Sequence, residues 1–181
     1  MKKLITLLML LLTVTLTGCA DYDDKEIVNP PEPVDVKLST TEYAAHGTKS
    51  FNVTAVTMAD GVVEGVKIDE YAFWQYASYN NVVCVPNGDN VEGLGQYYDG
   101  STQCLGSKRA NSDEYSAKMA EIAGATKTWL ESIKAIEDYA VGKTLEELKG
   151  FNSETDTIAG STLIDTNNYL QSVIAAIEAT E

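Results

Sequence analysis

The first half of the chain alternates between apolar and polar residues in three short runs. Residues 34–38 read V-D-V-K-L, residues 49–58 are rich in β-branched side chains, and residues 62–71 read V-V-E-G-V-K-I-D-E-Y. Alternation with a period of two is typical of a strand with one buried face. The dipeptide Asp60-Gly61 separates the second run from the third and suits a tight turn. The pattern therefore predicts antiparallel strands that include a β-hairpin.

After Asn111 the apolar positions recur at intervals of three and four residues. This spacing predicts one long amphipathic helix over residues 112–141. Gly142 suits its end, because glycine readily adopts the left-handed conformation that closes many helices. The expected inner face holds Met119, Ile122, Thr126, Trp129, Ile133, Ile136 and Ala140.

Two further helices are predicted nearer the C-terminus. The run T-L-E-E, which begins at Thr144, matches a capping box that opens a short helix ending near Gly150. Asp165 can cap a last helix. The inner face of that helix would hold Tyr169, Leu170, Val173, Ile174 and Ile177. Residues 71–104 are predicted to mix strand and loop. Strands followed by helices indicate an α+β fold, with antiparallel strands packed against a long helix and a C-terminal helix.

The N-terminus has the layout of a signal peptide. Two lysines precede an apolar run over residues 4–16, which is too short to be a good membrane-spanning helix. The tetrapeptide L-T-G-C that ends at Cys19 resembles the lipobox of bacterial lipoproteins, in which the cysteine is acylated and becomes the first residue. We therefore expect a lipoprotein signal peptide over 1–18 and a lipid on Cys19. The alternative is an ordinary signal peptide with an incidental cysteine.

Charge and composition divide the rest of the chain into a tether and one domain. Residues 19–35 are acidic and proline-rich, so we expect an extended tether of roughly 3 Å per residue before a domain over 36–181. Without the signal peptide, 11 basic residues face 27 acidic ones, a formal charge of −16. Such a surface repels nucleic acid and anionic lipid headgroups. We expect attachment to the cell membrane through the lipid alone, with the domain on the extracytoplasmic face.

Few residue types are present for catalysis or metal binding. His46 is the only histidine, which argues against a histidine-based metal cluster or catalytic triad. No set of residues suggests proton abstraction or attack on a substrate, so an electron-transfer protein is favoured over a self-sufficient enzyme. Cys84 and Cys104 would lie in an extracytoplasmic compartment. They can form a disulfide or remain two buried thiols, and the sequence leaves both alternatives open.

One small-residue phrase occurs twice, as I-A-G-A-T at 122–126 and within D-T-I-A-G-S-T at 156–162. The first copy falls inside the predicted long helix, where Thr126 would face the core. The second copy precedes a helix cap, and its small residues leave the hydroxyl of Thr162 accessible. Backbone amides near a helix N-terminus favour a phosphate there. The alternative is a Gly-Ser-Thr loop that merely caps the helix.

The second copy resembles the flavinylation motif of the FMN-binding domain family, roughly Asp-x-x-Ser/Thr-Gly-Ala-Thr. In that family a flavin transferase takes FMN from FAD and joins it to the last threonine through a phosphoester. The resemblance implies that Thr162 carries FMN covalently, and that Asp156, Gly160 and Ser161 are motif residues read by the transferase. Two positions depart from the family pattern: Ala159 replaces Ser or Thr, and Ser161 replaces Ala.

The resemblance extends over roughly residues 36–180. The hairpin T-A-V-T-M-A-D-G-V-V-E-G-V-K-I-D is similar to the opening strands of flavin-carrying lipoproteins of Gram-positive extracellular electron transfer. The segments L-G at 105–106, M-A-E-I-A-G-A-T-K-T-W at 119–129 and E-D-Y-A-V-G-K-T at 137–144 are similar to a repeat in the same proteins. This chain would hold a single copy of that repeat.

This resemblance implies a membrane-anchored flavoprotein that carries electrons. It would take them from a membrane quinol or dehydrogenase and pass them to extracytoplasmic acceptors. Aromatic residues of 71–98, and Trp129, are candidates to stack on the flavin ring, although each also suits a core. Two alternatives remain. One is a lipoprotein that binds FMN or a small ligand without a covalent bond, and the other is a tethered interaction domain without a cofactor.

Overall fold

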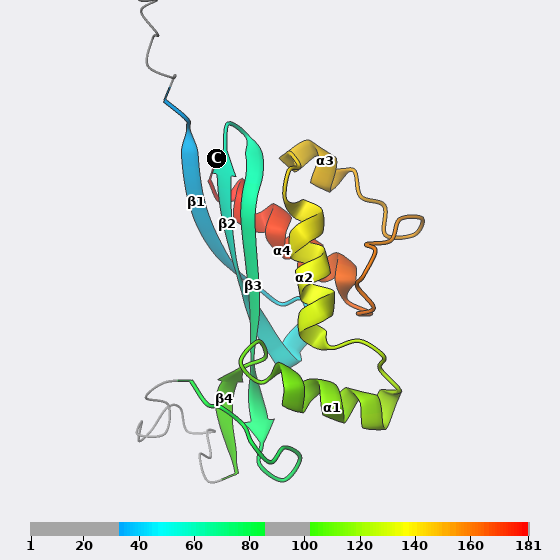
Figure 1. Cartoon of the computed structure of the whole chain (residues 1–181). Coiled ribbons are helices and arrows are strands. Elements are labelled where there is room, and N and C mark those ends of the chain that lie inside the picture. The colour runs from blue at the N-terminus through cyan, green and yellow to red at the C-terminus, as the bar shows by residue number, and fades with distance from the viewer. Residues whose placement is uncertain (1–32, 86–101, 181) are drawn as a thin grey trace, which may run out of the picture. The chain divides into compact units, whose positions relative to one another are not determined.

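Four antiparallel strands form the sheet, and each pairs with its neighbour in sequence. They are β1 (Val36–Tyr43), β2 (Ser50–Ala59), β3 (Val62–Gln75) and β4 (Gln103–Ser107), in the order β1-β2-β3-β4 (Figure 1). A single 3-10 turn, η1 (Gly47–Lys49), precedes β2. The computed structural model describes residues 33–85 and 102–180. The expected signal peptide, Cys19 and nearly all of the expected tether lie outside the described residues.

The predicted hairpin is confirmed. Asp60 and Gly61 join β2 to β3, and both have positive φ angles, of 50° and 80°. Asp-Gly is a favoured pair for such a turn, because both central residues must adopt a left-handed conformation. Strands β2 and β3, which this turn joins, provide most of the sheet residues that α2 and α4 contact.

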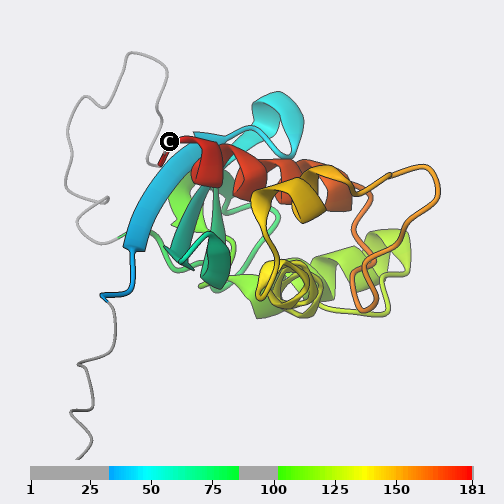
Figure 2. The ribbon, with the colours of Figure 1, turned by 90° about the horizontal axis from the view of Figure 1, so that it is seen from above.

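Four helices complete the domain: α1 (Ser112–Ala123), α2 (Trp129–Ala140), α3 (Leu145–Lys149) and α4 (Thr166–Glu178). Figure 2 shows α2 and α4 side by side on one face of the sheet, where α2 packs on β3 and α4 packs on β1 and β2. The predicted α+β class is therefore confirmed. Within the described residues, no helix is both long enough and apolar enough to cross a membrane.

The core lies between the sheet and these two helices. Alternate residues of β2 and β3 are buried, and they meet the predicted inner faces of α2 and α4. The fully buried side chains include Val56, Val63, Ile68, Ile133, Ile136, Leu170, Val173 and Ile177. Burial of aliphatic side chains of this size contributes about 1.5–3 kcal/mol each, and this area of contact holds the helices on the sheet.

The predicted long helix over 112–141 is wrong, because the chain leaves the helix between α1 and α2. Gly124 has a φ of +65° and closes α1. Thr128 then opens α2 with a capping box, in which Thr128 and Glu131 each bond the other's backbone amide. The segment thus contains a C-cap glycine and an N-cap signature only four residues apart, and these local signals prevail over the apolar spacing.

The break also corrects the expected inner face. Thr126 is exposed in the connection between the helices, and Ile122 is 61% exposed at the end of α1. Both were expected to face the core. Trp129, Ile133 and Ile136 do face the core, because all three lie in α2.

The caps of α3 and α4 differ from each other. Thr144 and Glu147 form the predicted capping box of α3. Asp165 occupies the N-cap position of α4 but makes no side-chain cap bond there. Its carboxylate lies instead 2.5 Å from Nδ1 of His46, which comes from the connection between β1 and β2.

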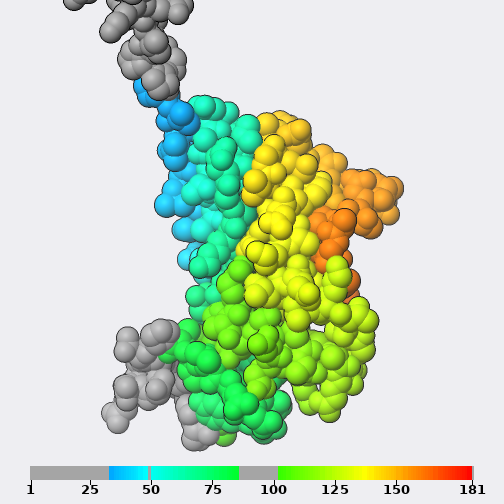
Figure 3. Space-filling view, in the orientation of Figure 1, coloured from blue at the N-terminus to red at the C-terminus, as the bar shows by residue number. Residues whose placement is uncertain are grey.

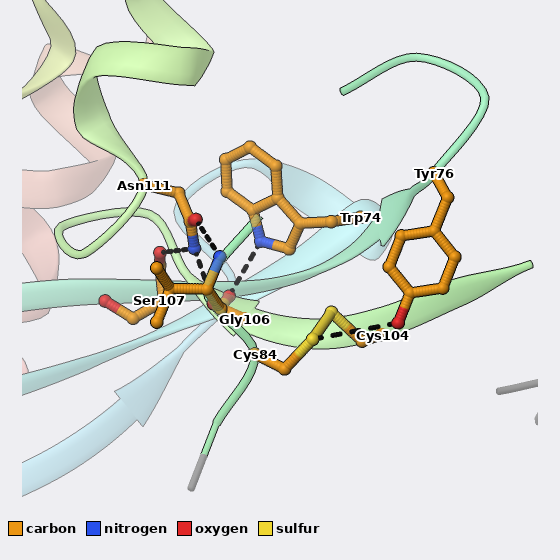
Figure 4. The surroundings of a disulfide bond; sticks show 8 residues. Trp74, Tyr76, Cys84, Cys104, Gly106, Ser107 and Asn111 are labelled. Carbon is orange, nitrogen blue, oxygen red and sulfur yellow. Dashed lines mark hydrogen bonds between the residues drawn. A yellow bond between two sulfur atoms is a disulfide. The ribbon is translucent and has the colours of Figure 1, made fainter. Parts of the chain in front are cut away.

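Cys84 and Cys104 form a disulfide, which decides between the two alternatives left open by the sequence. The bond ties the chain before the undescribed residues 86–101 to β4 (Figure 4). Beside it, the Trp74 indole N–H donates to the carbonyl oxygen of Gly106 at 2.9 Å. Asn111 accepts from the amide of Val83 and donates to its carbonyl oxygen. A cross-link over 20 residues typically stabilises a fold by about 3 kcal/mol.

Candidate functional site

The second copy of the phrase, residues 156–162, lies in the connection between α3 and α4. Buried Ile158 fixes this connection to the core, and its carbonyl oxygen accepts the amide of Ser161 at 3.1 Å. Gly160 has a φ of +99°, and a Cβ atom there would stand only 3.0 Å from the Cβ of Ala135. Both the backbone angle and the close approach to α2 require glycine at this position.

Thr162 is exposed, and α2 holds its backbone. Its amide donates to Oγ of Ser132 at 3.3 Å, and its own hydroxyl oxygen lies 3.4 Å from the same atom. Ser132 is fully buried in α2. The position of the Thr162 hydroxyl is therefore defined by the helix, although the side chain is open to solvent.

Asp156 and Ser161 lie away from that hydroxyl. Asp156 is exposed and accepts the amide of Asn152 at 2.8 Å, so its carboxylate shapes the start of the connection. The hydroxyl of Ser161 lies 2.7 Å from the hydroxyl of Thr166, at the start of α4. Both residues line a separate hollow of about 400 Å³ that does not include Thr162. The structure thus places Gly160 and Ser161 next to Thr162 in the chain, but it does not bring Asp156 to the same pocket.

Thr162 lines a pocket of about 240 Å³. The lining comes from α1, from the connection between α1 and α2, from the first residue of α2, and from the residues on either side of the start of α4. His46, from the connection between β1 and β2, and Lys108, directly after β4, complete it. The lining is mostly apolar and aromatic. Its members are His46, Lys108, Tyr115, Ser116, Met119, Ala123, Ala125, Lys127, Trp129, Thr162, Leu163, Ile164, Asp165 and Tyr169. Trp129 was predicted as a stacking residue, and it lies here as a buried wall of the pocket.

The two copies of the phrase meet at this pocket. Ala123 and Ala125 of the first copy line it, as does Thr162 of the second. The ammonium of Lys127, directly after the first copy, donates to the carbonyl oxygen of Gly160 at 2.9 Å. Figure 3 shows the yellow-green segment between α1 and α2 close to the orange segment before α4. The contact between the two copies was not predicted from the sequence.

A buried ion pair lies beside the pocket, and its lysine is one of the lining residues. Lys108 is 4% exposed and Glu70 is 1% exposed, and Nζ of the lysine stands 2.7 Å from Oε1 of the glutamate. The hydroxyls of Ser50 and Tyr169 donate to the same carboxylate. The lysine ammonium also lies 4.3 Å from the ring centre of Tyr115. The pair is therefore fully surrounded by hydrogen-bonding and aromatic groups.

Burial and pairing change the proton affinities in this cluster. Burial by itself would raise the pKa of Glu70, but the charge of Lys108 and the hydrogen bonds from Lys108, Ser50 and Tyr169 hold it below its usual value. Burial lowers the pKa of Lys108, and Glu70 and Asp165 offset part of that effect. Burial and the charge of Glu70 raise the pKa of Tyr115 to about 12. The glutamate is therefore ionised at neutral pH, and Tyr115 keeps its proton.

The adjacent residue forms a second, partly buried ion pair with a different task. Arg109 pairs with Glu137 of α2, and both side chains bond the backbone of Ile68. Strand β4 pairs only with the last part of β3, from Tyr71 onward, so these side chains satisfy backbone groups of β3 beyond the end of β4. This second pair joins α2 to the sheet and does not line the pocket.

Sequence analysis did not identify Lys108, Glu70, Tyr115 or Tyr169 as site residues. One signal was present for Glu70, because the alternation along residues 62–71 places it on the same face as apolar Ile68. An acidic residue on a buried strand face needs a partner, which would have called for a search for a buried cation.

No protein-family model, curated protein or solved structure matches the chain.

Proposed function

We propose that this protein is a membrane-anchored flavoprotein electron carrier with FMN joined to Thr162 through a phosphoester. The observation that carries the proposal is the placement of the Thr162 hydroxyl. It is exposed, its position is set by α2, and it stands at the edge of a pocket with aromatic walls. The resemblance of residues 156–162 to a flavinylation motif supports the same residue.

The surroundings of Thr162 suit a phosphate. Lys127 lies across the connection and bonds the carbonyl oxygen of Gly160, so its positive charge stands close to a phosphoester on Thr162. Asp156 is exposed, which leaves it open to recognition by a flavin transferase. Gly160 permits the backbone turn that presents the threonine, while Ser161 is bonded to Thr166 and points elsewhere.

The rest of the proposal concerns where the carrier works. Bound FMN supplies one- and two-electron chemistry, and the protein supplies its position and its electrostatic surroundings. A lipid on Cys19 would hold the domain at the extracytoplasmic face of the cell membrane. There the donor would be a membrane quinol or dehydrogenase. Covalent attachment keeps the flavin from diffusing away outside the cell.

Mass spectrometry tests the proposal directly. The full chain is co-expressed with a flavin transferase, and the intact protein and its peptides are weighed. The expected result is a peptide spanning residues 156–162 that is heavier by one FMN less water. Thr162→Ala should abolish the increase. Flavin that is released on denaturation would support noncovalent binding instead. A colourless, unmodified protein would favour a tethered interaction domain without a cofactor.

A further inference from the structure

The buried lysine beside the pocket calls for an explanation beyond stability. Lysine is rarely buried without a partner, and Lys108 is paired with Glu70. Replacement of a buried ion pair by apolar residues is often neutral or stabilising, so a need for stability does not by itself account for such a pair. The neighbouring pair of Arg109 and Glu137 has a clear structural task, because it satisfies the backbone of Ile68.

Lys108, unlike Arg109, is among the residues that line the pocket. Lys108 lines the pocket that includes Thr162, and it also lines a second hollow of about 180 Å³. Glu70 lines the second hollow and not the pocket beside Thr162. Of this ion pair, Lys108 and not Glu70 is therefore the member that lines the pocket beside Thr162.

We propose that this pocket holds the isoalloxazine ring of the flavin on Thr162, and that Lys108 stabilises the negative charge that the ring gains on reduction. This inference rests on the proposed function. It goes further because it assigns the redox-tuning residue and the form of the reduced flavin.

The pocket suits one fused-ring system. Its volume of about 240 Å³ lies below the range of roughly 300–1,000 Å³ typical of pockets that enclose a whole drug-sized ligand. The phosphate would remain at the edge, on Thr162, and the ring would enter between apolar walls. Those walls include the side chains of Met119 and Leu163 and the aromatic rings of Tyr115 and Trp129.

The negative charge of the reduced flavin follows from the balanced reduction. With a quinol as donor, the step is QH2 + FMN → Q + FMNH⁻ + H⁺. The quinol loses two electrons and two protons, and the flavin gains both electrons and one of the protons. A cation beside the ring favours this singly protonated product over FMNH2, which takes up both protons. The protein then couples one proton to two electrons.

Several other charged and titratable groups surround Lys108. Glu70 reaches it from β3 and Tyr115 from α1. Tyr169 of α4 bonds Glu70, and Asp165 lies close enough to raise the pKa of Lys108. His46 is bound to Asp165. Asp165 is engaged by His46, and Glu70 accepts from the hydroxyls of Ser50 and Tyr169 as well as from Lys108. Lys127 is a second lysine in the lining, and it bonds the carbonyl oxygen of Gly160.

The test compares midpoint potentials of the flavin-loaded protein at pH 6 to 8 for three substitutions. Lys108→Met removes the positive charge and should lower the equilibrium constant for reduction at least tenfold, equal to about 30 mV for a two-electron couple. Glu70→Gln removes the opposing charge and should raise that constant. Opposite signs identify a charge effect, because loosened packing would shift both variants in the same direction. Lys118→Met, at a half-buried position of α1 that does not line the pocket, is the matched control and should leave the potential unchanged.

The wild-type protein provides a test that needs no variant. Its potential should change with pH at the slope of one proton per two electrons. A slope of two protons per two electrons throughout this range would overturn the inference, even if Lys108→Met does not fold. Equal potentials in all variants would also overturn it, while FMN on Thr162 would leave the carrier proposal intact. Absence of FMN from the wild-type peptide would reject the carrier proposal, and this inference with it.

Discussion

The two copies of the small-residue phrase have nearly the same letters and different conformations. In the first copy, Ile122 and Ala123 end α1 and Gly124 is its C-cap, so the last three residues follow the helix. In the second copy the whole segment is a connection, with Ile158 buried as its anchor and Thr162 exposed at a pocket. Both threonines are exposed, and the comparison shows that the surrounding fold decides which of them lies at a pocket.

The largest expected difference between the copies is in flavin attachment. Thr162→Ala should lose all added FMN, because the acceptor hydroxyl is gone. Thr126→Ala should retain full attachment, since that exposed threonine follows a helix end and does not line the pocket. In-gel flavin fluorescence and intact mass measure both. Loss of flavin in Thr126→Ala, with Thr162→Ala unaffected, would mean that the first copy is the acceptor.

The two glycines should differ in their contribution to stability. A Cβ atom at Gly124 would have no neighbour within 4 Å, so Gly124→Ala strains only the left-handed backbone. It should lower the free energy of unfolding by about 1 kcal/mol. Gly160 has a φ of +99°, and a Cβ atom there would stand 3.0 Å from the Cβ of Ala135. Gly160→Ala should therefore lower the free energy of unfolding by about 3 kcal/mol. Urea denaturation of the two variants gives the comparison. Equal losses would show that the connection before α4 shifts freely.

The cap that follows the first copy should respond to acid. Thr128→Ala removes the N-cap of α2 and should cost about 1 kcal/mol at pH 7. The amide and hydroxyl of Thr128 donate to the carboxylate of Glu131 and lower its pKa. A lowered pKa gives stability above the unfolded-state value that is lost as pH falls through the folded-state value.

The penalty for Thr128→Ala should therefore shrink on acidification, and urea titrations from pH 7 to pH 3 measure it. Thr144→Ala, in the matching capping box of α3, is the control and should behave in the same way. A penalty that does not depend on pH would show that Glu131 takes no part in the cap.

The smallest expected effect comes from converting the first copy of the phrase to the full family motif. Ala120→Asp with Ala123→Ser converts the first copy to D-E-I-S-G-A-T, which matches the family pattern fully. We expect no FMN on Thr126, because these positions are helical in α1 and cannot adopt the extended form of the second copy. Peptide mass spectrometry distinguishes the two threonines. FMN on Thr126 would show that the transferase reads letters and not conformation.

Local periodicity predicted the first three strands, the hairpin and the inner faces of α2 and α4, but not β4. The break at Gly124 was missed because the apolar spacing continues through it, although Thr128 and Glu131 carry a capping signature. Thr162 was identified by its motif. The pocket was not predicted, because its walls come from His46 to Tyr169, and no pattern along the chain reveals which distant residues converge.

The order of the strands has a consequence for the timing of cofactor attachment. Each strand of the sheet pairs with its neighbour in sequence, and contacts of this local kind form early in folding. Helix α4 packs on β1 and β2, which lie far from it in the sequence. The hydroxyl of Ser39, for example, donates to the carbonyl oxygen of Ala176, 137 residues away. The connection that carries Thr162 is held between α2 and α4, so it takes its final form only after α4 has docked. A transferase that recognises this form would act on the completed fold, and attachment would itself report that folding had succeeded.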